Sequence, residues 1–183
     1  MPIHLSEAEL LAGLDRVKQA PQDDGVLELI VTRAREDERT LADRCEVSFR
    51  LGVHGDNWAD HCWRTLPDGS PHPDVQVAII NSRCIALLAQ EKSRWPLAGD
   101  NLYVDLDLSR DNLSAGQRLA IGSALFEITG EEHNGCSKFA GRYGRDALKF
   151  VNSPTGKQLR LRGIYAKVVK DGSIKVGDRI KKV

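Results

Sequence analysis

The pattern that most limits the fold of this chain is a run of short alternating segments separated by glycine turns in its second half. Three of these segments are predicted strands, at residues 102–106, 118–121 and 124–129. Gly116 and Gly122 mark the bends between them, because glycine adopts positive φ at no steric cost. Many short strands with few helices are typical of a sheet that closes on itself. We therefore predict a mainly β (α+β) fold, a closed or strongly bent β-barrel with peripheral helices.

Two further strands are predicted before this run, at residues 25–33 and 44–51. Both segments alternate between apolar and polar residues and are rich in branched side chains. We expect them to pair with each other across the charged turn at residues 34–40.

A buried strand and a hairpin complete the predicted sheet. Residues 74–81 are mostly apolar and lead into a short predicted helix at 85–90. Near the C-terminus, Asp171-Gly172 lies between alternating segments, which is a strong hairpin signal. We expect residues 163–169 to pair with residues 173–182 across that turn.

The N-terminal segment is predicted to be a helix outside the barrel. Ser6 and Glu9 form a capping box, and apolar residues follow at helical spacing as far as Val17. A chain of 183 residues suits one domain with a short extension. We expect residues 1–24 to form a helical extension and residues 25–183 to form the barrel domain.

Composition limits the partners and the compartment. The 26 basic residues balance the 26 acidic residues, which gives no global attraction to nucleic acid. No segment approaches the ~18 apolar residues that a membrane-spanning helix needs. The four cysteines form no CxxC pair, and no apolar run near the N-terminus resembles a signal peptide. We expect a soluble cytoplasmic protein with free thiols that binds neither nucleic acid nor a membrane.

Cys136 begins a predicted helix that carries a stripe of positive charge. At 100° per residue, Lys138, Arg142, Arg145 and Lys149 share one narrow face. The positive end of the helix dipole and these cations would favour a thiolate, the form that binds metals and attacks sulfur. Residues 136–162 hold seven basic residues and one acid, a patch that suits a small anionic ligand. The simpler interpretations are a buried structural cysteine and a solvated basic face.

A second group of candidate metal ligands lies in the polar loop at residues 54–73. His54, Asp56, Asp60, His61 and Cys62 are close together in the sequence. Their spacing matches no common zinc pattern, and ligands from one loop would be held loosely. We favour a polar loop over a zinc site. Cys45 and Cys84 lie in apolar segments and are predicted core residues, and Cys62 is predicted to be partly buried.

The order of the motifs resembles the MOSC family, the molybdenum cofactor sulfurase C-terminal domain, in its small stand-alone bacterial form. Each motif is weak alone, but their order and spacing over residues 25–183 are specific. The matching positions are residues 52–56 (GVHGD), 76–81, 99–102 (GDNL), 113–129, Cys136 with Phe139, 162–166 (RGIYA) and 172–180 (GSIKVGDRI).

The resemblance implies a molybdenum cofactor of the molybdopterin type and a set of residues that bind it. Cys136 corresponds to the cysteine that is the proposed molybdenum ligand, or the carrier of its sulfur, in the family. The other implied cofactor-binding residues are Asn101, Asp100, Lys138, Arg142, Arg145, Arg162, His54 and Asp56. The cations would neutralise the terminal phosphate of the pterin, and arginine can do so with two hydrogen bonds. Asn101 would offer an amide to the pterin or substrate.

The chain departs from the family pattern at three positions near these residues. Gly135 stands where the family commonly has proline, Asp100 replaces a glutamate, and Trp58 stands where many members have histidine. The change at Gly135 should affect only loop stiffness. Trp58 removes any histidine role at that point.

Two functions follow from the resemblance. In the first, the protein is an oxidoreductase that cleaves the N–O bond of N-hydroxylated compounds, with Cys136 as molybdenum ligand and a separate flavin or iron–sulfur reductase as electron donor. In the second, Cys136 carries persulfide sulfur from a cysteine desulfurase, or holds the cofactor for delivery, without turnover. A third, weaker alternative is a fold retained without cofactor. Pyridoxal phosphate is expected only through a desulfurase partner.

Overall fold

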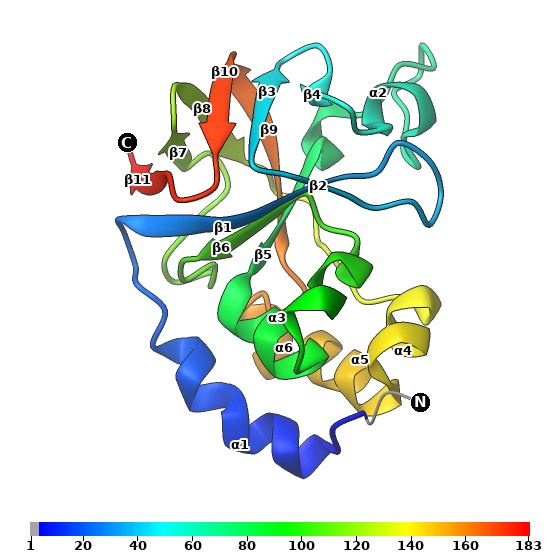
Figure 1. The fold of residues 1–183 in the computed structure, drawn as a ribbon, viewed down its shortest axis with the longest axis vertical. Helices are drawn as coiled ribbons and strands as arrows, with labels where there is room; N and C mark the ends of the chain where they lie inside the picture. Colours follow the sequence, from blue (N-terminus) through cyan, green and yellow to red (C-terminus); the bar gives the residue numbers. More distant parts are fainter. Residues whose placement is uncertain (1–3) are drawn as a thin grey trace.

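The computed structural model describes residues 4–183 and places a closed β-barrel above a layer of helices (Figure 1). Seven strands close the barrel: β1 (Gly25–Thr32), β11 (Arg179–Lys182), β7 (Arg118–Ile121), β8 (Ala124–Ile128), β9 (Ile164–Lys170), β5 (Val77–Asn81) and β6 (Leu102–Asp105). β6 pairs with β1, which closes the ring, and the β5–β6 pair is parallel. Apolar side chains such as Leu27, Ile79 and Phe126 fill the interior. The predicted barrel with peripheral helices is confirmed.

A small sheet lies at one end of the barrel and consists of β10 (Gly172–Lys175), β3 (Arg44–Ser48) and β4 (Gly52–Val53). β2 (Thr40–Ala42) adds to the end of β1. The predicted pairing of residues 25–33 with 44–51 is therefore wrong, because β3 pairs with β10 and β4. One edge of β1 carries β6 and the other carries β11 and β2, so β1 has no edge left for β3.

The predicted C-terminal hairpin is also wrong. β9 lies between β5 and β8, so both of its edges are already hydrogen-bonded when the chain reaches Asp171-Gly172. β10 instead crosses to β3, and β11 closes the barrel between β7 and β1. The Asp171 side chain accepts a hydrogen bond from the backbone of Phe49 at 2.8 Å, which ties this turn to the small sheet.

The helices other than the short one after β4 pack against one outer face of the barrel (Figure 1). The N-terminal helix α1 (Glu7–Lys18) begins with the predicted capping box of Ser6 and Glu9. It packs against α3 (Ser82–Ala89) and α5 (Arg145–Asn152), and its Leu10 and Leu14 enter a second core with outward residues of the barrel such as Ile80. The remaining helices are α2 (Trp58–His61), α4 (Ser137–Tyr143), α6 (Pro154–Gln158) and the 3-10 segments Pro73–Val75 and Lys92–Ala98. Within residues 4–183, no helix is long and apolar enough to cross a membrane.

The predicted basic helix is divided in two at Gly144. This residue has φ 98° and ends α4 before α5 begins at Arg145. The single face of four cations is therefore wrong: Lys138 and Arg142 belong to α4, and Arg145 belongs to α5. A Cβ on Gly144 would lie 2.9 Å from the Cβ of His4, so close packing of the N-terminal segment also requires glycine here.

Candidate functional site

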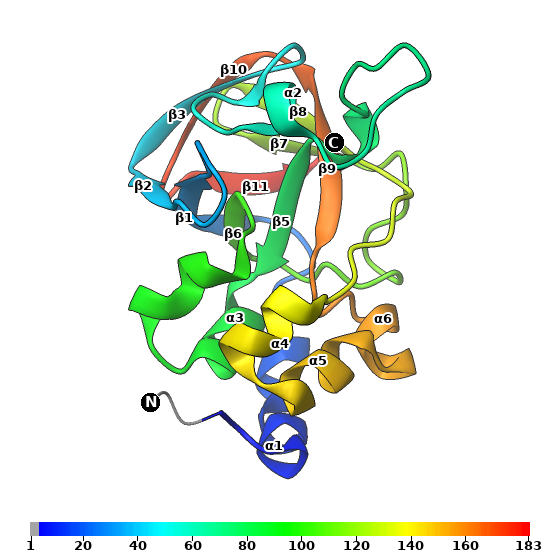
Figure 2. The ribbon, with the colours of Figure 1, turned by 90° about the vertical axis from the view of Figure 1, so that its right-hand side faces the viewer.

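A cavity opens on the barrel face that carries β5 and β9, the face that lies between α2 and α4 in Figure 2. It has a volume of about 500 Å³, part of it open to solvent. We call it the arginine cavity, and its lining includes Arg33, Trp58, Cys62, His133, Arg162 and Tyr165. Two arginines with an aromatic wall suit a planar or anionic ligand.

Arg33 is held in place from several sides, above all by Asp56. Its Nε donates to Oδ1 of Asp56 at 2.8 Å, and its Nη2 donates to Oδ2 at 2.7 Å. Nη1 donates to the carbonyl oxygen of Gly99 at 2.9 Å. Burial disfavours the charge, but the hydrogen bonds and the charge of Asp56 outweigh it and raise the pKa of Arg33. The predicted site residue Asp56 thus acts through an arginine that sequence reasoning missed.

Arg162 and Asp100 form a buried ion pair beneath the arginine cavity. Nη1 of Arg162 donates to Oδ2 of Asp100 at 2.7 Å, and Nη2 donates to the carbonyl oxygen of Ala98 at 3.0 Å. Burial raises the pKa of Asp100, and the neighbouring Arg162 opposes that shift. The guanidinium also lies over the ring of Phe139, 5.0 Å from its centroid. Both residues were predicted from the sequence, and the structure brings them together.

Three buried polar atoms, two of them in this ion pair and one in the neighbouring His133, have no hydrogen-bond partner. They are Nε of Arg162, Oδ1 of Asp100 and Nδ1 of His133. Nδ1 of His133 lies 3.5 Å from Oδ1 of Asp100, just beyond a normal hydrogen bond. Burial, with Arg162 and Arg33 nearby, lowers the pKa of His133 well below its ordinary value. Buried unpaired atoms of this kind cluster where a fold keeps polar groups for a function.

Asn101 has a structural place behind the arginine cavity. Its Oδ1 accepts from the backbone of Ala78 at 3.1 Å and from Nη2 of Arg33 at 3.2 Å, and its Nδ2 donates to the carbonyl of Val31 at 3.3 Å. The amide is fully buried. Asn101 therefore helps to position Arg33, which lines the cavity, and its own amide is occupied by hydrogen bonds within the fold.

Cys136 is exposed and directly precedes α4 as its N-cap residue. As the N-cap residue, Cys136 lies at the positive end of the α4 dipole, and no side chain forms a capping hydrogen bond there. The preceding residue, Gly135, is clamped by Asn152: its N–H donates to Oδ1 of Asn152 at 2.9 Å, and its carbonyl accepts from Nδ2 at 3.1 Å. Phe139, one turn after Cys136, carries Arg162 on its ring. The interpretation of Cys136 as a buried structural cysteine is therefore wrong.

The cations after Cys136 differ in their surroundings. Lys138 forms an ion pair with Glu36, and Nη2 of Arg142 donates to Oδ1 of Asp37 at 2.7 Å. Both acids belong to the turn between β1 and β2, so this turn neutralises the basic face of α4. Arg145 is exposed at the start of α5, away from these pairs.

The loop after β4 places its predicted histidine His54 outside the arginine cavity and its candidate thiol Cys62 in the cavity lining. His54 is exposed, and its Nε2 is 2.9 Å from Oγ of Ser48, away from the cavity lining. Cys62 is half-buried and lines the cavity, whereas Cys45 and Cys84 are buried as predicted. Across residues 4–183, no three His, Cys, Asp or Glu side chains gather closely enough to hold a metal ion.

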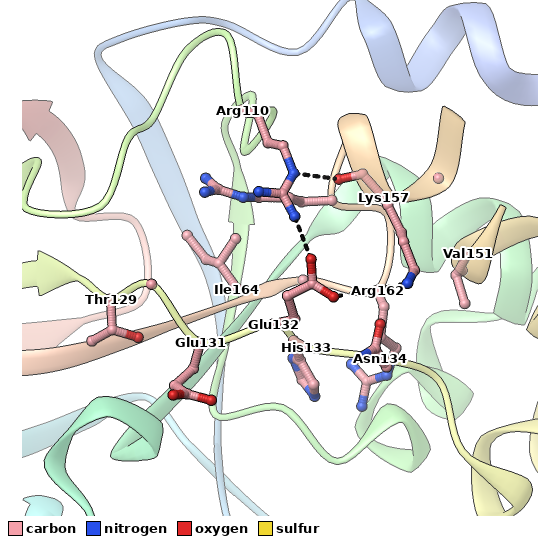
Figure 3. A pocket seen from close by; sticks show the side chains of 14 residues that line it. Arg110, Thr129, Glu131, Glu132, His133, Asn134, Val151, Lys157, Arg162 and Ile164 are labelled. Atoms are coloured by element: carbon pink, nitrogen blue, oxygen red, sulfur yellow. Dashed lines mark hydrogen bonds and ion pairs between the residues drawn. The ribbon is translucent and has the colours of Figure 1, made fainter. Parts of the chain in front are cut away.

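A second cavity lies on the other side of His133 and Arg162 (Figure 3). It has a volume of about 420 Å³ including open solvent. Glu132 crosses it and pairs with Nη2 of Arg110 at 2.7 Å, and Nζ of Lys157 lies 3.8 Å from the same carboxylate. His133 and Arg162 line both cavities, so they form the wall between them.

The family model for the MOSC domain matches residues 53–181, and the chain belongs to the MOSC domain family. Its fold is similar to the YuaD protein from Bacillus subtilis, with a TM-score of 0.60, 18% identity and coverage of 86% of this chain and 94% of that one. It is also similar to YiiM from Escherichia coli, with a TM-score of 0.56, 16% identity and coverage of 86% and 69%. YiiM from Geobacillus stearothermophilus gives a TM-score of 0.55, 19% identity and coverage of 88% and 73%. No curated protein matches the chain.

Proposed function

We propose that this protein binds the molybdenum cofactor and reduces N-hydroxylated compounds, with Cys136 as the molybdenum ligand. The observation that carries the proposal is the exposed, uncapped thiol at the helix turn that packs on Arg162, one of the two arginines of the cavity. The family is associated with this cofactor. Thiolate sulfur is the kind of ligand that molybdenum prefers.

The chemistry of the arginine cavity fits such a cofactor. Nε of Arg162 is buried and unpaired, which leaves one directed donor for an anionic or carbonyl oxygen. Arg33 keeps 23% of its side chain exposed, so a phosphate can reach it. Tyr165 and Trp58 add aromatic rings to the cavity lining, and such rings can pack against a flat pterin.

The two cavity arginines and the residues that hold the site in place have distinct tasks in this proposal. Arg33 and Arg162 bind the anionic cofactor, and Asp56 and Asp100 hold the two guanidinium groups in position. Asn152 fixes the loop that presents Cys136. The bound cofactor would supply the electron pair that cleaves the N–O bond of the substrate. A flavin or iron–sulfur reductase is the proposed electron donor.

The proposal is tested by turnover with a chemical electron donor. Protein purified from a host that makes the cofactor should reduce an aromatic amidoxime to the amidine when reduced viologen is supplied. Cys136→Ser should abolish turnover, whereas Cys62→Ser, the matched change of the thiol inside the cavity, should retain it. Equal activity of wild type and Cys136→Ser would refute the role of Cys136. Loss in both variants would assign Cys62 to the reaction as well.

A second function is favoured by the exposure of Cys136. A sulfur carrier must present its thiol to a cysteine desulfurase, and an exposed cysteine on a helix N-terminus can do so. This function predicts a persulfide on Cys136 after incubation with a desulfurase and cysteine. Mass spectrometry should then detect one added sulfur atom on the peptide that contains Cys136. A protein with neither cofactor nor persulfide would indicate a fold retained without cofactor.

A further inference from the structure

His133 occupies a position that the functions above leave unexplained. Its ring lines both the arginine cavity and the second cavity, and only 9% of its side chain is exposed. Figure 3 shows the ring among the side chains of the second cavity. The ring stacks on Tyr165, with centroids 4.4 Å apart. Such a ring has one fixed orientation, so its two nitrogens have separate surroundings.

The Nδ1 atom faces a carboxylate. Oδ1 of Asp100 is 3.5 Å away and has no other partner, while Oδ2 is occupied by Arg162. The backbone of Gly163 lies close to both atoms: a Cβ at this residue would be 3.3 Å from Asp100 Oδ1 and from His133 Nδ1. A proton on Nδ1 is therefore attracted by Asp100, whereas a lone pair on Nδ1 would face a negative oxygen.

The Nε2 atom has no hydrogen-bond partner among residues 4–183, and unlike Nδ1 it is not buried. The charged groups around the ring are Asp100 before β6, Arg162 before β9 and Arg33 after β1, with the hydroxyl-bearing Tyr165 on β9. The two arginines disfavour a positive charge on the imidazole. A neutral ring with its proton on Nδ1 leaves Nε2 as a hydrogen-bond acceptor.

We propose that His133 recognises the substrate in the arginine cavity. Asp100 favours the Nδ1–H form of the ring, so Nε2 accepts a hydrogen bond from the N–OH group of the substrate. This inference rests on the proposed function and narrows its substrate class. Amidoximes and hydroxylamines carry the required O–H donor. N-oxides and O-alkylated amidoximes lack it and would leave Nε2 unpaired, so the cavity discriminates against them.

The first test is the protonation state of His133 by nitrogen-15 NMR on histidine-labelled protein. We expect a neutral ring protonated at Nδ1 that persists from about pH 8 to about pH 5.5. The missing resonance of His133→Phe assigns the signal, and His133→Gln serves if the phenylalanine variant does not fold. An Nε2–H form, or a ring that becomes charged near the ordinary histidine pKa, would overturn the proposal.

The second test is binding of benzamidoxime and its O-methyl ether to the same protein, followed by the His133 resonance. Wild type should bind benzamidoxime about tenfold more tightly than the ether, as expected for one buried hydrogen bond. His133→Phe, which keeps a ring to stack on Tyr165, should lose this preference. His54→Phe, a matched change of an exposed histidine outside the cavity lining, should keep it.

The outcomes separate this inference from the proposed function. Equal binding of the two compounds by wild type, or an unchanged preference in His133→Phe, would overturn the role of His133 even in a molybdenum-loaded protein. Selective binding of benzamidoxime by a protein that never contains molybdenum would refute the proposed cofactor and support the role of His133. No binding of either compound would overturn the inference.

Discussion

The ion pair between Arg33 and Asp56 should be the strongest single electrostatic support of the arginine cavity. Asp56→Asn keeps the size of the side chain but removes its charge and places an amide N–H against Nη2 of Arg33. Breaking a fully buried pair costs ~3–5 kcal/mol. The Asp56 side chain is 1% exposed, but Arg33 is 23% exposed and keeps its bond to Gly99, which reduces the cost. We expect a loss of about 2–3 kcal/mol in the free energy of unfolding.

The matched control is Asp24→Asn. Asp24 also pairs with an arginine through two bonds, from Nε of Arg179 at 3.0 Å and from Nη2 at 2.6 Å, but both side chains are more than half exposed. Solvent screens such a pair, so its loss should be much smaller. Urea unfolding of the two variants and wild type measures the difference, and Asp56→Asn should also lower Tm by roughly 4–12 °C. Equal losses in the two variants would refute the conclusion that burial makes the Asp56 pair strong.

Three further predictions concern His133, the acidic turn and the Cys136 loop. Burial holds the pKa of His133 well below 6.5, so its contribution to stability is present above that pH and is lost as the pH falls. Between about pH 7.5 and about pH 5.5, wild type should lose ~1.4 kcal/mol more than His133→Phe in urea unfolding, and parallel pH profiles would contradict this. The double change Glu36→Gln with Asp37→Asn removes the acidic partners of Lys138 and Arg142, so it should tighten pyrophosphate binding, measured by calorimetry at low salt. Glu38→Gln in the same turn should change this affinity little. Equal effects of the two changes would indicate that net charge alone sets the affinity. Asn152→Ala removes both hydrogen bonds to Gly135 and should lower stability by about 1–3 kcal/mol while accelerating hydrogen exchange at Gly135, and unchanged exchange would show that Asn152 does not clamp the loop.

Local signals in the sequence predicted single elements well. The capping box of Ser6 and Glu9 begins α1 as expected, and the strand at residues 118–121 is β7. These elements depend on neighbours in the chain, on side-chain alternation and on turn residues. The partners of the strands depend on which edges are already occupied. That information is not local, which is why the pairing of residues 25–33 with 44–51 and the C-terminal hairpin were wrong.

The site was predicted in part for the same reason. Asp56, Asp100 and Arg162 could be named from motif order, and the structure brings Asp100 and Arg162 together. Arg33 has no motif of its own, and only its position directly after a buried strand could have indicated it. His133 lies three residues before Cys136, but its approach to Asp100 joins segments far apart in the chain, and no spacing in the sequence reveals it.

The most direct test of the account is the molybdenum content of the protein, measured by elemental analysis with pterin fluorescence after purification from a host that makes the cofactor. Wild type should contain nearly one molybdenum per chain, and Cys136→Ser should lose the metal while remaining folded. Cys62→Ser, which changes the thiol that lines the arginine cavity, should keep it. The same metal content in wild type and Cys136→Ser, or none in wild type, would contradict the central claim that Cys136 is the molybdenum ligand.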